Sequence, residues 1–486
     1  MRRSPFRIAA AVLLAALLAT NVYRAVTQSI VHDEAFSWEL YLSGPASAIF
    51  TTWDPNNHFL ATLLFRISTS LFGFSGLAMR LPSLLAGALY FGAVFRLCLL
   101  LFGEGWVFLL GTALLSLNPM VLDFLVAARG YGLGIATLFW ALCEMTAYLQ
   151  AGGNRNRRHL WRAAAGLSMA VAANLAYLFP ATILAIAFSV QVLRTRPATP
   201  ALPAKQHKKQ KTPTPAPSSR LAHFVVPIIG LALLYLLSAP VDLIRTQRFV
   251  GAASALESAR NLVQFSFTSG EVGAKLCTDL IVWFLTAGSL AALCGAILFR
   301  ASAAWTLLAP VTVVGTALLH ALGHLALGLP YPTDRAGIHF VPLAALSYIV
   351  LAWSLLERSG YLRWIGRASL AICLVFIAVF ISEWHTSYFE YWRYDADTNR
   401  LFEKIEKIRG SQTNVRLGAS WQLEPALNFY RARRHADWML PVERDGFTGD
   451  RQYYAFITND HAQIGLRRLA VIYRGAVSGT VLATAH

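Results

Sequence analysis

Two adjacent acidic residues, Asp33 and Glu34, follow the first apolar segment of the chain. That segment runs from Ile8 to about Tyr23, and arginines precede it. Carboxylates just past the end of a membrane helix are costly unless they face water or take part in chemistry. If the basic N-terminus stays in the cytoplasm, the pair emerges on the opposite face of the membrane. There it could take a proton from a molecule that reaches this face.

Further polar groups are expected on the same outer face, at the ends of other apolar segments. Carboxylates together with arginines suit a reaction that creates negative charge on a phosphate while an acceptor loses a proton. Any one of these charged side chains could instead have no functional role, with its apolar part buried and its charged end reaching the membrane interface. Their common location favours a site, and the groups are Asp54–His58, Arg80, Asp123, Arg129–Gly132 and Tyr331–Arg335.

The composition is that of a polytopic membrane protein. Of 486 residues, 56% are hydrophobic and only 14% are charged, whereas a soluble domain is about a quarter charged. The net charge of +17 comes from basic residues in loops between apolar segments, as the positive-inside rule predicts, which argues against nucleic acid as a partner. The five cysteines are scattered without CxxC spacing, so neither a disulfide framework nor a zinc site is indicated.

The apolar segments predict about eleven transmembrane helices, because about 20 apolar residues cross a bilayer. Three basic loops with few or no acids, 152–162, 194–220 and 358–367, fall on the cytoplasmic side if the N-terminus is inside. A cleaved signal peptide is the alternative for the first span. The expected spans are 7–25, 80–102, 106–124, 130–150, 162–178, 179–194, 222–242, 279–299, 303–327, 338–356 and 368–383.

Three segments are expected to differ from these spans. The first outer loop, 28–79, contains an amphipathic segment at 57–72 that is too short to span and predicts an interfacial helix, or a core helix against the bundle. The proline- and lysine-rich segment 195–221 predicts a disordered cytoplasmic linker that could touch anionic lipid. Residues 384–486 are about a quarter charged and predict a small extracytoplasmic α/β domain after a transmembrane domain of residues 1–383.

An ordered set of motifs resembles the GT-C superfamily of membrane glycosyltransferases. The similarity spans about residues 30–345, and the group it most resembles comprises bacterial relatives of protein O-mannosyltransferases and lipid A aminoarabinose transferases. The fold so implied is an all-α polytopic domain with interfacial helices on its outer face. The motifs are Asp33–Phe36, Asp54–Leu60, Leu71–Gly73, Arg80–Leu85, Asn118-Pro119, Ala128–Leu133, Asp334–Gly337 and Phe340–Leu343.

The resemblance implies transfer of a sugar from a polyprenyl-phosphate donor, undecaprenyl in bacteria, at the periplasmic face of the inner membrane. Inversion at the anomeric carbon is usual in this group. The acceptor could be a protein, a lipid or a glycan. Asp33 would be the general base and Glu34 would assist it. Substrate-binding residues implied by the resemblance are Asn57, His58, Arg80, Arg129, Tyr131, Asp334 and Arg335.

The chain departs from the group at Asn56–Leu60, where many relatives have a His-Pro-Pro-Leu-type segment. The departure bears on sugar or acceptor preference. His58 could bind phosphate or, with His32 and Asp33, a divalent metal ion; the alternative is that no cofactor is required. A transporter or flippase is the alternative function, but no internal repeat is evident. A non-catalytic scaffold would leave Asp33 and Glu34 unexplained.

Overall fold

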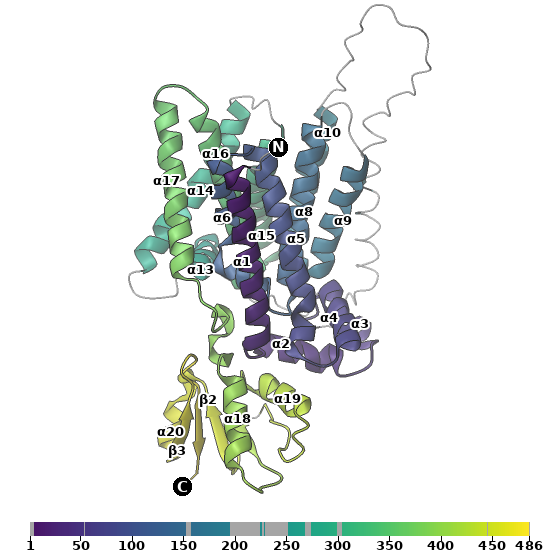
Figure 1. Cartoon of the computed structure of the whole chain (residues 1–486), viewed down its shortest axis with the longest axis vertical. Helices are drawn as coiled ribbons and strands as arrows, with labels where there is room; N and C mark the ends of the chain where they lie inside the picture. The colour runs from purple at the N-terminus through teal and green to yellow at the C-terminus, as the bar shows by residue number, and fades with distance from the viewer. Residues whose placement is uncertain are drawn as a thin grey trace, which may run out of the picture. The chain divides into compact units, whose positions relative to one another are not determined.

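The computed structural model of the chain is mostly helical, with one small sheet near the C-terminus (Figure 1). The structure describes residues 4–52, 54–151, 157–194, 224–225, 228, 251–267, 274–298, 304–444 and 446–485. The predicted linker at 195–221 lies outside these residues, as does nearly all of the predicted span at 222–242.

Eight of the described helices are long and apolar enough to cross a membrane, which identifies an integral membrane protein. Each coincides with one of the segments expected from hydropathy. They belong to α1 (Pro5–Thr27), α5 (Gly76–Phe102), α8 (Gly130–Gln150), α10 (Leu178–Arg194), α14 (Ala274–Leu298), α15 (Leu308–Leu327), α16 (Phe340–Leu356) and α17 (Tyr361–Ser382).

The expected span at 106–124 is divided into α6 (Trp106–Ser116) and α7 (Pro119–Phe124). The division falls at Asn118-Pro119, where the proline has no N–H for a continuous helix. The Asn118 side chain accepts a hydrogen bond from the backbone N–H of Val121 and so begins α7 (3.1 Å). The segment expected at 162–178 corresponds to α9 (Arg157–Ala173), which is not among the eight apolar helices. Hydropathy did not predict α13 (Ala255–Phe267).

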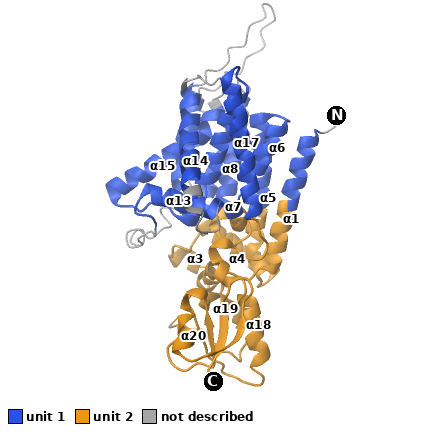
Figure 2. Cartoon of the chain, turned by 90° about the vertical axis from the view of Figure 1, so that its left-hand side faces the viewer, with its two compact units in different colours: residues 1–16, 86–121, 133–383 blue, residues 17–85, 122–132, 384–486 orange. Residues whose placement is uncertain are grey.

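The chain forms two compact units, coloured separately in Figure 2. The first contains residues 1–16, 86–121 and 133–383, and the second contains residues 17–85, 122–132 and 384–486. The boundary predicted after residue 383 therefore remains a prediction. The second unit groups the C-terminal residues with the first loop and with the short segment around Arg129.

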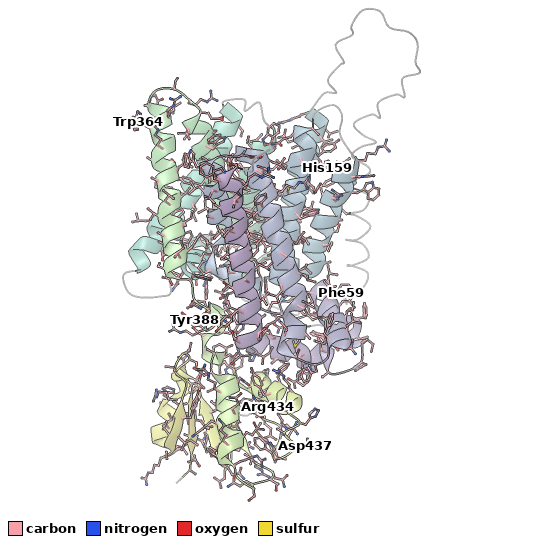
Figure 3. The ribbon with its side chains drawn as sticks, viewed as in Figure 1. Phe59, His159, Trp364, Tyr388, Arg434 and Asp437 are labelled. Atoms are coloured by element: carbon pink, nitrogen blue, oxygen red, sulfur yellow. The ribbon has the colours of Figure 1, made fainter. Side chains whose placement is uncertain are left out.

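The C-terminal part of the second unit contains a four-stranded mixed sheet of order β1-β2-β4-β3. Its strands are β1 (Leu417–Ala419), β2 (Tyr453–Phe456), β3 (Ala470–Arg474) and β4 (Val481–Thr484). Two helices, α18 (Thr398–Ile408) and α19 (Glu424–Arg433), pack on each other. Arg434, labelled in Figure 3, joins them through Glu403 and Glu406 at 2.7 and 3.0 Å.

The segment expected as an interfacial helix forms α4 (Phe59–Phe72). Its buried residues are Ala61, Thr62, Phe65 and Ser68, which carry the face turned into the protein. On the other side, Ile67, Leu71 and Phe72 near the end of the helix are exposed, and Leu71 is 71% exposed. Exposed large apolar side chains on an amphipathic helix suit contact with lipid.

Candidate active site

The candidate site is built around α2 (His32–Ser37), which begins shortly after α1 ends. Asp33 and Glu34 lie in the first turn of this helix, where the positive end of the helix dipole favours acidic side chains. All residues of α2 except Phe36 are buried. The helix α2 and the residues that contact Asp33 and Glu34 all belong to the second unit.

Glu34 is completely enclosed, with an exposed fraction of 0%. Its Oε1 accepts hydrogen bonds from Arg80 Nε (2.9 Å) and from the backbone N–H of Ala128 (2.7 Å). Its Oε2 accepts from Arg80 Nη2 (2.6 Å) and from the backbone N–H of Val31 (3.1 Å). Both oxygens are thus occupied by protein donors, which compensate the cost of burying the charge.

Arg80, on α5, uses its whole guanidinium in the same way. Nη1 donates to the carbonyls of Ala25 (3.2 Å) and Gln28 (2.9 Å), and Nη2 donates to that of Ser29 (2.7 Å). With the two bonds to Glu34, all five N–H groups of the side chain have protein partners. This arrangement leaves no donor for a substrate and favours a structural role for Arg80 over the expected substrate contact.

Asp33, the neighbouring carboxylate, has a looser partner. Its Oδ2 lies 3.8 Å from Arg129 Nη2, and its side chain is 9% exposed. Arg129 Nη1 donates to the Asp33 carbonyl (3.2 Å) and to Ser37 Oγ (2.8 Å), and Nη2 donates to Asn56 Oδ1 (2.6 Å). Arg129 therefore links the α2 helix to the loop that carries Asn56 and orients Asp33 without enclosing it.

The loop before α4 contributes the other predicted residues of this unit. Asn57 donates to the carbonyl of Ile49 at 2.9 Å and so stabilises its own loop. The His58 and Tyr131 rings meet edge to face, with centroids 5.0 Å apart. The structure thus brings His58 and Tyr131 together, and both side chains are largely buried.

A second ion pair, between Arg24 and Asp123, ties α1 and α7 to the C-terminal segment. Arg24 Nη2 also donates to the carbonyl of Tyr388, labelled in Figure 3, at 3.0 Å. Asp123 Oδ2 accepts from the backbone N–H of Glu390 (2.8 Å). The ring of Phe389 lies 5.0 Å from the guanidinium carbon of Arg24 and 5.2 Å from that of Arg80.

Asp395, also from the C-terminal segment, holds the start of α2. Its Oδ2 accepts from the backbone N–H of His32 (2.7 Å), and its Oδ1 accepts from Thr398 Oγ1 (3.1 Å). Burial raises the pKa of Asp395 well above its ordinary value, and the nearby charges of Asp33 and Glu34 act in the same direction. Three acidic side chains therefore lie close together here, and two of them have no solvent exposure.

His32 is held as a neutral ring. Its Nδ1 lies 2.7 Å from the carbonyl of Gln422, which can only accept a hydrogen bond, so Nδ1 carries the proton. Burial lowers the pKa of His32 and favours the neutral form. Nε2 then carries a lone pair, and it makes no hydrogen bond with any part of the chain that the structure describes.

The expected metal site of His32, Asp33 and His58 is not assembled. Within the described ranges, no three His, Cys, Asp or Glu side chains are placed to hold a metal ion. One ring nitrogen of His32 is bonded to Gln422, and the His58 ring packs on Tyr131. We therefore derive no step through a metal.

The close approach at Gly132 explains the glycine next to Tyr131. A Cβ at this position would lie 2.0 Å from the carbonyl oxygen of Phe124, so no other residue fits without a backbone shift. This contact holds α7 against the first turn of α8 and so positions Arg129 between them.

The remaining predicted residues, Asp334 and Arg335, lie in the first unit on a turn before α16. The turn is anchored by α13: Asn261 Oδ1 accepts from the backbone N–H of Asp334, and Ser258 donates to the carbonyl of Pro332, each at 2.5 Å. Asp334 has φ 49°, in the left-handed region.

Beside this turn is a cavity of about 350 Å³ with mainly apolar walls. Tyr331, Pro332 and His320 contribute to it.

The sequence did not identify the residues that hold α2 and Arg129 in place around Asp33. Asn56 belongs to a quoted motif and Ser37 directly follows one, so their polar types and positions were a usable signal. Asp395 and Tyr430, whose hydroxyl accepts from the backbone N–H of Ile30 at 2.8 Å, lie beyond the region of resemblance. No sequence pattern connects them to α2.

The expected GT-C fold is confirmed by solved structures. Crystal structures of ArnT from Cupriavidus metallidurans match the chain, which places it in the class of integral membrane proteins with the GT-C fold. The apo state is 13% identical with a TM-score of 0.53, and the state bound to undecaprenyl phosphate is 12% identical with a TM-score of 0.50. Each comparison covers 97% of both chains.

A weaker likeness is to an oligosaccharyltransferase from Archaeoglobus fulgidus in complex with Zn and sulfate. It is 11% identical, has a TM-score of 0.46 and covers 96% of this chain and 73% of the other. No family model matches the chain. No curated protein sequence matches it either.

Proposed function

We propose that the protein is a glycosyltransferase that moves a sugar from a polyprenyl-phosphate donor to an acceptor hydroxyl or amine, with Asp33 as the general base. The observation that carries the proposal is the difference between two adjacent carboxylates. Glu34 is fully bonded within the protein, whereas Asp33 is less enclosed and faces Arg129 at 3.8 Å. A base must be held in place yet reach its proton, and the contact of Asp33 with Arg129 together with its 9% side-chain exposure supports this role.

In the proposed reaction Asp33 takes the proton of the acceptor as the acceptor oxygen or nitrogen bonds to the anomeric carbon. The bond from that carbon to the phosphate oxygen breaks, and polyprenyl phosphate leaves with the electron pair. Attack opposite the leaving group inverts the anomeric carbon. The developing phosphate charge needs a cationic partner.

Arg129, in the second unit, and Arg335, in the first, are the two candidates for that partner. Arg129 Nη1 and Nη2 already donate to Asp33, Ser37 and Asn56, so contact with phosphate would require Arg129 to exchange protein partners. Arg335 lies on a turn beside the apolar cavity, whose volume and walls suit part of an isoprenoid chain. The ArnT structure bound to undecaprenyl phosphate supports this donor class.

We place the reaction at the outer face of a bacterial inner membrane. The positive-inside rule supports this orientation, since the three expected cytoplasmic loops are rich in basic residues and hold few or no acids. The exposed apolar side chains of Ile67, Leu71 and Phe72 on α4 support contact of the first loop with the outer leaflet.

The test is release of undecaprenyl phosphate by the purified protein in lipid vesicles. A panel of undecaprenyl-phosphate monosaccharides would be supplied with a membrane extract as acceptor, and release would be quantified by mass spectrometry. We expect wild type to release lipid phosphate from at least one donor and Asp33→Asn to be inactive. No release from any donor by folded wild type would refute the proposed reaction. Equal release by both proteins would refute the role of Asp33 alone.

A further inference from the structure

Beside His32 the second unit exposes an aromatic and cationic cluster that the reaction scheme above does not use. It consists of His32, Phe36, Trp421 and Arg444, which we call the Trp421 cluster. The rings of His32 and Trp421 pack edge to face, with their centroids 5.4 Å apart. The guanidinium carbon of Arg444 lies 5.1 Å from the Phe36 ring and 5.9 Å from the Trp421 ring.

Trp421 is 53% exposed, and membrane anchoring does not account for it. The other exposed tryptophans among the described residues lie on helices of the first unit or within two residues of the end of one. They are Trp106, Trp161, Trp283, Trp364 and Trp384. Trp421 instead follows β1 in the sheet region, where an open indole face has an apolar surface to offer to a ligand.

Arg444 is fixed at one nitrogen and open at the others. Its Nε donates to Glu424 Oε2 at 3.2 Å, and its side chain is 48% exposed. Glu424 in turn accepts from Asn428, which also binds the carbonyl of Val442, so the base of the Arg444 loop is stabilised. Neither Nη of Arg444 has a hydrogen bond to any residue in the described ranges, which leaves both available as donors.

His32 adds an acceptor to these donors. Because Nδ1 is committed to Gln422, Nε2 carries a lone pair, and Asp33 is the next residue in the chain. The Trp421 cluster therefore combines an apolar face, several N–H donors and one acceptor beside the proposed base. A saccharide ring is complementary to this set, since it has an apolar face of C–H groups and a rim of hydroxyls that both donate and accept.

We propose that the Trp421 cluster binds a sugar ring of a glycan acceptor and presents its hydroxyl to Asp33. The inference rests on the proposed function and specifies its acceptor class. Trp421 stacks on the ring, the Nη groups of Arg444 donate to ring oxygens, and His32 Nε2 accepts from a hydroxyl. An extended peptide would fit less well, because its backbone groups need a strand edge or groove along their length.

The direct test is hydroxyl-radical footprinting of the full chain in lipid nanodiscs. The probes are soluble trisaccharides of glucose, mannose, N-acetylglucosamine and xylose, with a Ser/Thr-containing hexapeptide as the competing class. We expect at least one trisaccharide to lower oxidation of Trp421 in a saturable way. Oxidation of Leu466, which is 76% exposed in the same unit, should stay constant. Absence of protection by every trisaccharide, or equal protection by the peptide, would overturn the inference.

A matched variant series separates this site from the chemistry. With a protecting trisaccharide as acceptor, Trp421→Ala should raise the acceptor KM by about 3- to 10-fold, and Trp421→Phe should restore part of the loss. The control Leu466→Ala should leave both the acceptor KM and the hydrolysis of the donor to water unchanged. An unchanged acceptor KM in Trp421→Ala would overturn the inference. Footprinting needs no turnover, so it tests the sugar site separately from the reaction. If a trisaccharide protects Trp421 but the protein releases no lipid phosphate, the proposed reaction is refuted and the sugar site is retained.

Discussion

The second unit contains two buried arginine–carboxylate pairs, which differ in how completely their charged atoms are hydrogen-bonded within the protein. In the Arg80–Glu34 pair every N–H of the arginine and both oxygens of the acid are bonded within the protein. In the Arg129–Asp33 pair the charged atoms are 3.8 Å apart, and the acid is 9% exposed. The closure of the first pair favours a structural role, whereas the looser second pair suits the proton transfer proposed for Asp33. Under that proposal, neighbouring residues of one helix have separate roles.

The largest effect should follow from opening the closed pair. Arg80→Ala leaves Glu34 charged, buried and without its main partner, which costs about 3–5 kcal/mol of folding free energy. We expect a much lower melting temperature in detergent and loss of all activity. The control is Arg7→Ala, because Arg7 forms a partly exposed pair with Glu104 (37% and 46% exposed) and exposed pairs contribute only about 0–1 kcal/mol. Similar melting temperatures for the two variants would show that the closed pair is not structural.

Asp33→Asn should separate chemistry from stability. The substitution keeps the shape of the side chain and removes only the basic oxygen, so the rate of transfer should fall by about 10²–10⁴-fold. The melting temperature should remain close to that of wild type, because Arg129 keeps its bonds to Ser37 and Asn56. Steady-state release of lipid phosphate and a thermal scan on the same sample make the comparison. If stability fell strongly while the turnover of the folded fraction stayed unchanged, Asp33 would have a structural role like that of Glu34 rather than a catalytic one.

Arg129→Lys tests whether the looser pair depends on a forked guanidinium. Lysine retains the charge but cannot reach Asp33, Ser37 and Asn56 in the same geometry. We expect kcat to fall by about 10- to 100-fold, with a smaller change in donor KM, because the base is displaced rather than the donor. A change confined to donor KM would instead make Arg129 a phosphate ligand, as the family resemblance implied.

Asp395→Asn should have the smallest effect. An amide oxygen still accepts from the His32 N–H, so activity should fall less than about 10-fold, whereas Asp395→Ala orphans that donor at a cost of about 1–3 kcal/mol. The pKa of Asp395 is raised in the folded state, so the folded protein binds the proton more tightly than the unfolded chain. The stability it contributes is present at low pH and is lost as pH rises from about 4 through the raised pKa. Melting temperatures of wild type and Asp395→Asn across this range check the sign, and parallel curves would contradict it.

The membrane class and the GT-C fold could be predicted from the sequence, because apolar length and ordered motifs are local properties. The sequence did not reveal that Glu34 and Arg80 enclose each other, since the burial of a charge depends on residues such as Ala128 that look inert in a motif. Asp123 was grouped with the reactive charges, but its oxygens bind Arg24 and the N–H of Glu390. The part played by Asp395 required the fold, because it pairs with a residue more than three hundred positions away.

That pairing sets an order of events during synthesis. His32 and Asp395 are separated by 363 positions, and Tyr388, Glu390 and Tyr430 join the same region from equally late in the chain. At about 5–20 residues per second, roughly 20–70 s separate the appearance of α2 from that of its last supports. The Glu34–Arg80 pair can close early, 46 positions apart. During translation the Glu34–Arg80 pair would therefore form first, and the C-terminal residues that support α2 would be present only when translation has almost ended. Nascent and C-terminally truncated chains in the membrane should therefore lack transferase activity.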